Sequence, residues 1–190
     1  SWWTACHGYN NGYISRIMKK QIDIMPHIMF GGLVHEEAIR LSNRITRLLK
    51  NNLKRVFFSD SGSVAIEIAI KMSLQYWQNN GFSNKNKFVY FKNAYHGDTT
   101  GAMAICDPEE GMHHLFKNYL KKNILVNIPD TLKREKEFEK LVDKNASSIA
   151  GIIIEPLIQC AGGMQIYSKR VLETKFKIKK KYNLILIYDE

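Results

Sequence analysis

Apolar residues recur three or four positions apart in four stretches of the chain. The first stretch, from about residue 35 to residue 51, is predicted to be an amphipathic helix. A second helix is predicted to begin after the Ser/Gly turn at 60–63 and to stop at Gly81, since glycine commonly ends helices. Two further helices are predicted over 135–144 and 168–182.

Short apolar runs rich in Val, Ile, Phe and Tyr lie between these helices and are predicted to be strands. A strand that is apolar at successive positions is buried on both faces, which is typical of a parallel sheet covered by helices. The pattern therefore predicts the α/β class, with a mostly parallel sheet flanked by helices. The predicted strands are KRVFF (54–58), KFVYF (87–91), NILVN (123–127), AGIIIEP (150–156) and NLILIY (183–188).

Both ends of the sequence look cut. The chain opens on SWWTACHGY with no initiator Met, and it closes with two carboxylates that follow an apolar strand directly. We therefore expect the 190 residues to be an internal piece of a longer protein, incomplete at both ends.

The formal net charge of +10 raises the possibility of nucleic-acid binding. Much of the basic excess lies in stretches where Lys alternates with Glu and with an apolar helical stripe, as solvated helix faces do. A basic nucleic-acid-binding module, using Lys177, Lys179, Lys180 and Lys181 on phosphates, is the alternative from another class. It predicts binding that weakens steeply with salt.

Three cysteines, Cys6, Cys106 and Cys160, are widely spaced and form neither a CxxC motif nor a Cys/His cluster. We expect a reduced chain without a metal site. No apolar run approaches the roughly 18 residues that a membrane helix needs. Together these features lead us to expect a cytoplasmic protein that does not bind membranes.

The turn Asp60-Ser61-Gly62-Ser63 lies between a predicted strand and a predicted helix. In an open α/β sheet such a turn lies near the ligand, where helix N-terminal N–H groups favour an anion. Gly62 allows close approach, and the serine hydroxyls could join the amides in binding a phosphate. Alternatively, Ser61 or Ser63 merely caps the helix. The turn matches neither a Walker loop nor GxGxxG.

Two further signals lie at the ends of other predicted strands. Tyr95 and His96 follow the strand that ends at Phe91, so Tyr95 could stack on a flat ring, although the pair could equally just pack the loop. Asp189 follows the last strand, where an ionised carboxylate needs a cationic partner such as a protonated pyridine nitrogen. A phosphate cup, an aromatic face and a carboxylate together match three contacts of pyridoxal 5'-phosphate.

Several motifs closely resemble the class III aminotransferases over essentially the whole chain. The resemblance implies fold type I of the pyridoxal phosphate-dependent transferases. Residues 1–34 would contribute to a small domain and to the substrate pocket, and 35–190 would form part of the cofactor-binding large domain. The motifs are SWWTACHGYN, MFGGLVHEEAIRLS, DSGSVAIEIAIKMSLQYW, YHGDTTGAMAICDP and IIIEPLIQCAGGM.

The resemblance also implies roles for single residues. The cofactor phosphate would bind at Gly62 and Ser63. The cofactor ring would stack on Tyr95, with His96 beside it, and Asp189 would pair with the ring nitrogen. Trp2 and Trp3, together with Tyr95, would contact the substrate. Glu155 matches a glutamate near the cofactor but receives no firm chemical role; it could simply be a strand-end carboxylate before Pro156.

Within this family the motifs are most similar to members that act in biotin synthesis. The implied reaction is a ping-pong transamination in which S-adenosylmethionine donates an amino group, through the cofactor, to 8-amino-7-oxononanoate, giving 7,8-diaminononanoate. Some relatives use lysine as the donor instead, and the choice stays open. Members acting on ornithine, acetylornithine or 4-aminobutyrate are the next alternative, although paired indoles at Trp2 and Trp3 suit a longer or adenosyl-bearing donor.

The family's Schiff-base lysine is expected beyond Glu190, so no catalytic residue is assigned here, and the 190 residues alone are expected to be inactive. The resemblance further implies a homodimer with sites at the interface. The last strand would leave an exposed sheet edge, which favours aggregation of the isolated piece.

Overall fold

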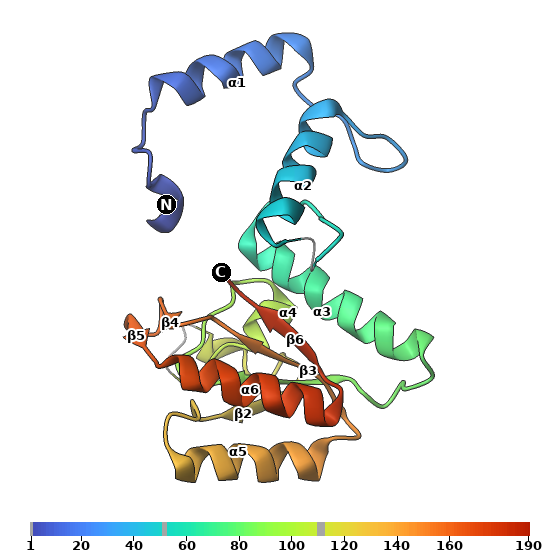
Figure 1. Cartoon of the computed structure of the whole chain (residues 1–190), viewed down its shortest axis with the longest axis vertical. Coiled ribbons are helices and arrows are strands. Elements are labelled where there is room, and N and C mark those ends of the chain that lie inside the picture. The colour runs from blue at the N-terminus through green and yellow to red at the C-terminus, as the bar shows by residue number, and fades with distance from the viewer. Residues whose placement is uncertain (1, 51–52, 110–112) are drawn as a thin grey trace. The chain divides into compact units, whose positions relative to one another are not determined.

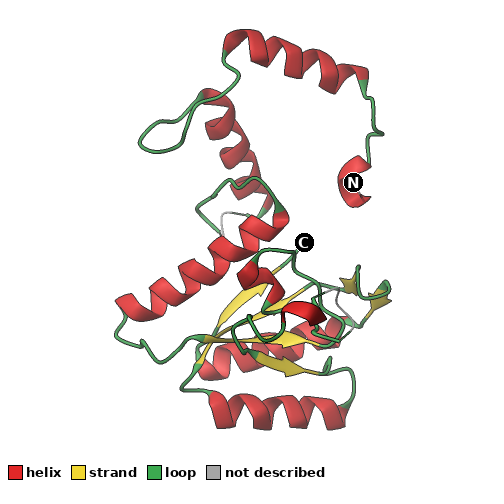
Figure 2. Cartoon of the chain, turned by 180° about the vertical axis from the view of Figure 1, so that it is seen from behind, coloured by secondary structure: helices red, strands yellow, loops and turns green. Residues whose placement is uncertain are grey.

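The computed structural model describes residues 2–50, 53–109 and 113–190, and the chain divides into two compact units. The first unit is Ser1–Phe57 and the second is Phe58–Glu190. Figures 1 and 2 show the elements of each unit. The predicted division at residue 34 concerns the roles of the two parts, and it stays a prediction.

The N-terminal unit consists of helices with almost no buried surface of their own. It contains η1 (Trp2–Ala5), α1 (Gly12–Ile24) and α2 (Glu36–Leu48). Asn11 caps α1, because its side-chain oxygen accepts from the N–H groups of Tyr13 and Ile14. Among the described residues of this unit only Ala38 is buried. The helix predicted over 35–51 is confirmed, whereas α1 was not predicted.

The second unit is a three-layer α/β structure around a parallel sheet. Its four strands are β1 (Lys87–Phe91), β2 (Ile124–Val126), β3 (Ile149–Ile154) and β6 (Ile185–Tyr188), in the spatial order β2-β1-β3-β6. Every neighbouring pair in this sheet is parallel. The predicted α/β class and the four corresponding strands are confirmed.

Helices cover both faces of this sheet (Figures 1 and 2). On one face α5 (Leu132–Asn145) and α6 (Lys169–Tyr182) pack against Val89, Phe91 and Ile152. On the other face α3 (Gly62–Asn79) and α4 (Thr100–Met103) pack against Phe88 and Tyr90. Successive side chains of β1 pack into the hydrophobic clusters on opposite faces of the sheet. The strand is therefore apolar at every position from 88 to 91, as its sequence predicted.

Two small elements complete the unit. A short antiparallel pair, β4 (Ile158–Gln159) and β5 (Gln165–Ile166), forms a separate sheet, and η2 (His114–Phe116) follows α4. None of these was predicted, since each is only two or three residues long. No helix of the described residues is long and apolar enough to cross a membrane.

The strand predicted over 54–58 is wrong. These residues form no strand, and Phe57 is 65% exposed. A strand needs a neighbour for its backbone N–H and C=O groups, and no strand of the described residues pairs with this segment. The apolar run alone therefore did not define a strand.

Candidate functional site

Three of the predicted site segments meet at the carboxyl end of the parallel sheet. The loop 92–99 follows β1, Glu155 follows β3, and Asp189 follows β6. β2 lies on one side of β1 and β3 on the other, so the chain reverses its direction of strand addition here. In open α/β sheets ligands bind at such a switch point, beyond the carboxyl ends of the strands.

The residues predicted to bind an anion lie at the N-terminus of α3. Ser61 is the N-cap, and its Oγ accepts from the Val64 N–H at 3.2 Å. The first intrahelical hydrogen bond runs from the Ala65 N–H to the Ser61 carbonyl, so the helix backbone offers no acceptor to the N–H groups of Gly62 and Ser63. A Cβ added to Gly62 would meet no atom within 4 Å, which leaves this surface open. The capping alternative holds for Ser61, and phosphate binding at Gly62 and Ser63 stays a prediction.

The loop after β1 packs directly on the start of α3. Ser63 Oγ accepts from the Asp98 N–H at 3.0 Å, and Thr99 Oγ1 donates to the Ser63 carbonyl at 3.3 Å. Gly97 allows this approach, since it has a φ of +120° and an added Cβ would overlap the Ser63 side chain. The loop therefore needs glycine at this position for both its conformation and its packing.

Tyr95 is held by contacts with three side chains, one of them within its own loop. Its N–H donates to Glu155 Oε1 at 3.2 Å, and its hydroxyl donates to Asp98 Oδ2 at 3.0 Å. Its ring packs nearly parallel to that of His113, with centroids 5.9 Å apart and planes 19° apart. Burial and the bond to Asp98 raise the pKa of Tyr95 to about 12, so the phenol stays protonated.

His96 and Asp189, which are 93 positions apart, meet in the structure. His96 Nδ1 lies 2.7 Å from Asp189 Oδ2, and the Asp189 N–H extends the sheet by donating to the Ile154 carbonyl at 3.0 Å. The imidazole is buried and its backbone N–H donates to Cys106 Sγ. The geometry assigns the Nδ1–H tautomer, which donates to the carboxylate. His96 thus orients the Asp189 carboxylate through this hydrogen bond.

Glu155 joins two loops through its carboxylate. Oε1 accepts from the Tyr95 N–H, and Oε2 accepts from the Cys160 N–H at 2.9 Å. Burial raises the pKa of Glu155, while the two amide bonds oppose that shift. The sequence left this residue without a role, and the structure gives it a positioning one for the Tyr95 loop.

Sequence reasoning missed the supporting residues Asp98, Cys106, Asp107 and His113. Cys106 is buried, its pKa is raised to about 11 by burial, and it remains a thiol that donates to the Ala102 carbonyl. Asp107 accepts from the Asn93 N–H at 2.7 Å and so shapes the start of the loop. Only Asp98 carried a signal, since it stands three residues after Tyr95 in the YHGD motif.

Trp2 and Trp3 lie in η1 of the N-terminal unit, and their side chains fall outside the described part of the chain. Their role in a substrate pocket stays a prediction. Within the described residues no group of three or more His, Cys, Asp or Glu side chains could hold a metal ion.

Two basic residues of α6 pair with acidic residues of α5. Lys181 Nζ lies 2.7 Å from Glu139 Oε1, and Arg170 Nε lies 2.8 Å from Glu135 Oε1. These pairs use part of the positive charge of α6 within the fold. They favour the solvated-face interpretation over the nucleic-acid alternative.

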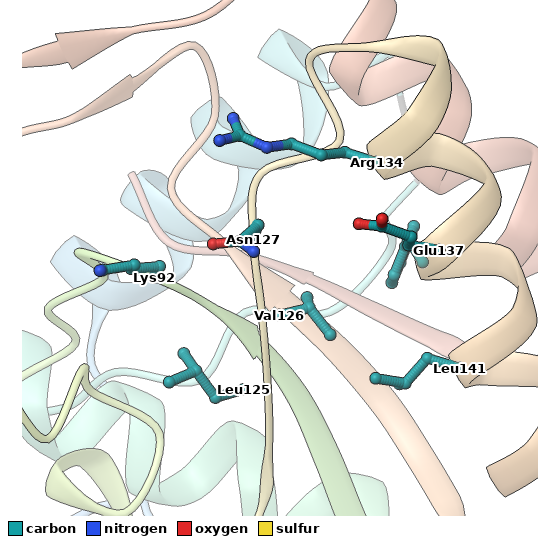
Figure 3. A pocket seen from close by; sticks show the side chains of 8 residues that line it. Lys92, Leu125, Val126, Asn127, Arg134, Glu137 and Leu141 are labelled. Atoms are coloured by element: carbon teal, nitrogen blue, oxygen red, sulfur yellow. The ribbon is translucent and has the colours of Figure 1, made fainter.

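A cavity of about 300 Å³ lies apart from these residues, between β2 and α5. Figure 3 shows Lys92, Arg134 and Glu137 around apolar side chains that include Leu125 and Leu141. Arg134 pairs with Asp130, at 2.8 Å from Nη1 to Oδ1. None of the predicted site residues lines this cavity.

The family comparison defines the class of the protein. The sequence profile described as aminotransferase class-III matches residues 1–190. The chain belongs to the class III aminotransferases, and its fold is that of the fold-type I pyridoxal phosphate-dependent enzymes.

More specific similarity lies within one group of this family. The chain is 42% identical over 198 residues to adenosylmethionine-8-amino-7-oxononanoate aminotransferase of Buchnera aphidicola subsp. Schizaphis graminum, which covers 100% of this chain and 45% of that protein. It is 41% identical over 198 residues to the protein of the same name from Corynebacterium glutamicum, covering 100% of this chain and 46% of that protein. The chain thus spans a little under half the length of the curated relatives it matches.

Comparison with solved structures gives the same family. The adenosylmethionine-8-amino-7-oxononanoate aminotransferase of Methanocaldococcus jannaschii superposes with a TM-score of 0.91 at 33% identity, covering 96% of this chain and 42% of that one. An amine transaminase from an uncultivated Pseudomonas species, solved with pyridoxal phosphate bound, gives a TM-score of 0.84 at 25% identity over 96% of this chain and 45% of that one.

Proposed function

We propose that the protein is a pyridoxal phosphate-dependent aminotransferase of biotin synthesis. It would use S-adenosylmethionine as the amino donor and convert 8-amino-7-oxononanoate to 7,8-diaminononanoate. The observation that carries this proposal is 42% identity, extending over the whole chain, to a relative named for this reaction.

The residues of the second unit fit the cofactor. Anions bind at helix N-termini, and the open amides of Gly62 and Ser63 would hold its phosphate. Asp189 would contact the ring nitrogen, and the Tyr95 ring would lie against the cofactor ring. These groups belong to one connected set, because Ser63 contacts Asp98, Asp98 contacts Tyr95, and His96 contacts Asp189.

When bound, pyridoxal phosphate supplies a ring that accepts electrons from the substrate carbon. The Asp189 carboxylate would keep a proton on the ring nitrogen, and the His96 Nδ1–H would hold that carboxylate in place. Glu155 and Asp98 would orient Tyr95 by binding its backbone N–H and its hydroxyl. A homodimer completing the site belongs to the same proposal.

The test uses the protein expressed from its complete reading frame and reconstituted with pyridoxal phosphate. A visible absorbance band of the bound cofactor that S-adenosylmethionine bleaches, together with formation of 7,8-diaminononanoate, is the expected result. Bleaching by lysine alone would mean that lysine, and not S-adenosylmethionine, is the amino donor. Bleaching by ornithine or 4-aminobutyrate alone would contradict the assignment to biotin synthesis. Absence of any cofactor band would contradict the whole proposal.

A further inference from the structure

His113 is a buried histidine in the loop that leads into η2, 18 positions after Tyr95. Its ring lies nearly parallel to that of Tyr95, at a plane angle of 19° and a centroid distance of 5.9 Å. Flat rings at this separation attract each other beyond the effect of their buried area. His113 therefore covers one face of Tyr95.

His113 and Tyr95 also share a carboxylate. Asp98 Oδ2 accepts from the Tyr95 hydroxyl at 3.0 Å, and Asp98 Oδ1 lies 3.5 Å from His113 Nε2. The second distance fits an ion pair but is too long for a good hydrogen bond, and Nε2 has no hydrogen-bond partner among the described atoms. The stacking of the two rings, more than the contact between His113 Nε2 and Asp98, therefore fixes how His113 lies against Tyr95.

The hydrogen bond to Asp98 would not hold Tyr95 in one orientation by itself. The Asp98 side chain is 66% exposed, so water competes for its oxygens. The His113 side chain, in contrast, is only 6% exposed and cannot move aside without opening the loop. A buried flat ring behind Tyr95 restricts the tilt of the phenol far more than an exposed carboxylate can.

We propose that His113 is a positioning residue that backs the Tyr95 ring and leaves only its opposite face available to the cofactor ring. This inference rests on the proposed function, because it assigns the free face of Tyr95 to the cofactor. His113 itself touches neither cofactor nor substrate. It acts by reducing the conformational freedom that Tyr95 would lose on binding.

Three variants test the inference in the protein expressed from its complete reading frame. His113→Ala removes the backing ring, His113→Phe keeps a flat ring without nitrogens, and His114→Ala is the matched control, since His114 is the exposed neighbour. The affinity for pyridoxal phosphate is measured from the absorbance of reconstituted apoprotein. We expect about a three- to tenfold loss for His113→Ala, from the strength of a stacked pair, and less than about a twofold loss for the other two variants.

A second readout needs no cofactor. With 3-fluorotyrosine at position 95, the fluorine NMR signal of the apoprotein should move toward that of the free amino acid in His113→Ala. It should remain shifted from the free amino acid in His113→Phe, which keeps a flat ring against Tyr95, and should stay unchanged in His114→Ala. A protein that binds no cofactor would contradict the proposed function, while this signal would still report on the ring contact. The inference is overturned if His113→Ala leaves the signal unchanged, or if His113→Phe loses affinity as His113→Ala does.

Discussion

Replacing Lys175 with methionine should stabilise the protein, and most strongly at neutral pH. Lys175 lies on the core face of α6 with Val171 and Ile178, and it is 0% exposed. Its Nζ has no hydrogen-bond partner in the described part of the chain; it lies 4.0 Å from the centroid of the Phe91 ring and 4.9 Å from that of Tyr167. Burial lowers the pKa of this amine to about 6.

The magnitude follows from that pKa. The unfolded chain carries a protonated lysine with a pKa near 10.5, whereas the folded chain holds it neutral at pH 7. Releasing the proton at pH 7 costs about 5 kcal/mol. Repacking the core around a different side chain offsets about 1.5 kcal/mol of the gain from removing this cost. Methionine fills a similar volume without the charge, so Lys175→Met should raise the free energy of unfolding by about 3 kcal/mol.

The sign of the pH dependence is also fixed. Because the folded-state pKa lies below the unfolded-state value, the wild-type free energy of unfolding should rise as the pH goes from about 6 to about 10.5. The gain from Lys175→Met should accordingly fall below about 1 kcal/mol at pH 10.

Urea unfolding, followed by tryptophan fluorescence at pH 7 and pH 10, measures both effects. Lys180→Met, an exposed position on the same helix, is the control and should change the free energy of unfolding by less than about 0.5 kcal/mol. Equal gains from Lys175→Met at the two pH values would refute the reasoning, and so would a loss of stability at pH 7.

Three other substitutions test the site. Asp189→Asn keeps a partner for His96 Nδ1–H but removes the charge, so the transaminase rate of the reconstituted protein should fall by about two orders of magnitude while its melting temperature changes little. Gly97→Ala introduces a Cβ at positive φ against Ser63 and should lower the free energy of unfolding by about 2–4 kcal/mol in urea titrations; an unchanged midpoint would contradict the packing described for this loop. Ser61→Ala removes the α3 cap and should cost about 1 kcal/mol in the same assay.

Most of the sheet could be predicted from the sequence because its strands are buried on both faces. Val89 and Tyr90 face opposite clusters, and such strands read as continuous apolar runs. The same pattern misled at 54–58, because pairing depends on a neighbouring strand and not on the run itself. Helix α1 was not predicted, although Ile14, Ile17 and Met18 recur at helical spacing in its sequence; none of its residues is buried in the structure.

Candidate residues of the site could be selected from the sequence where polar groups follow an apolar run. Tyr95, His96 and Asp189 stand out because they follow apolar runs that read as buried strands, and open α/β sheets bind ligands beyond the carboxyl ends of such strands. Their pairing was not predictable, since His96 and Asp189 meet only after β1, β3 and β6 have assembled side by side. Lys175 shows the opposite case, in which a charged residue that normally marks a surface occupies a core position of α6.

The central place of β1 also shapes how the chain can fold during synthesis. One edge of β1 pairs with β2, where Val89 aligns with Ile124, and the other pairs with β3, where Lys87 aligns with Ile149. A ribosome releases the chain from its N-terminus, so β1 emerges about 60 residues before its second neighbour, and parallel pairing offers it no local hairpin in the meantime. Nascent chains that have passed β1 but not yet β3 therefore expose an unpaired edge of β1, which favours chaperone binding and aggregation.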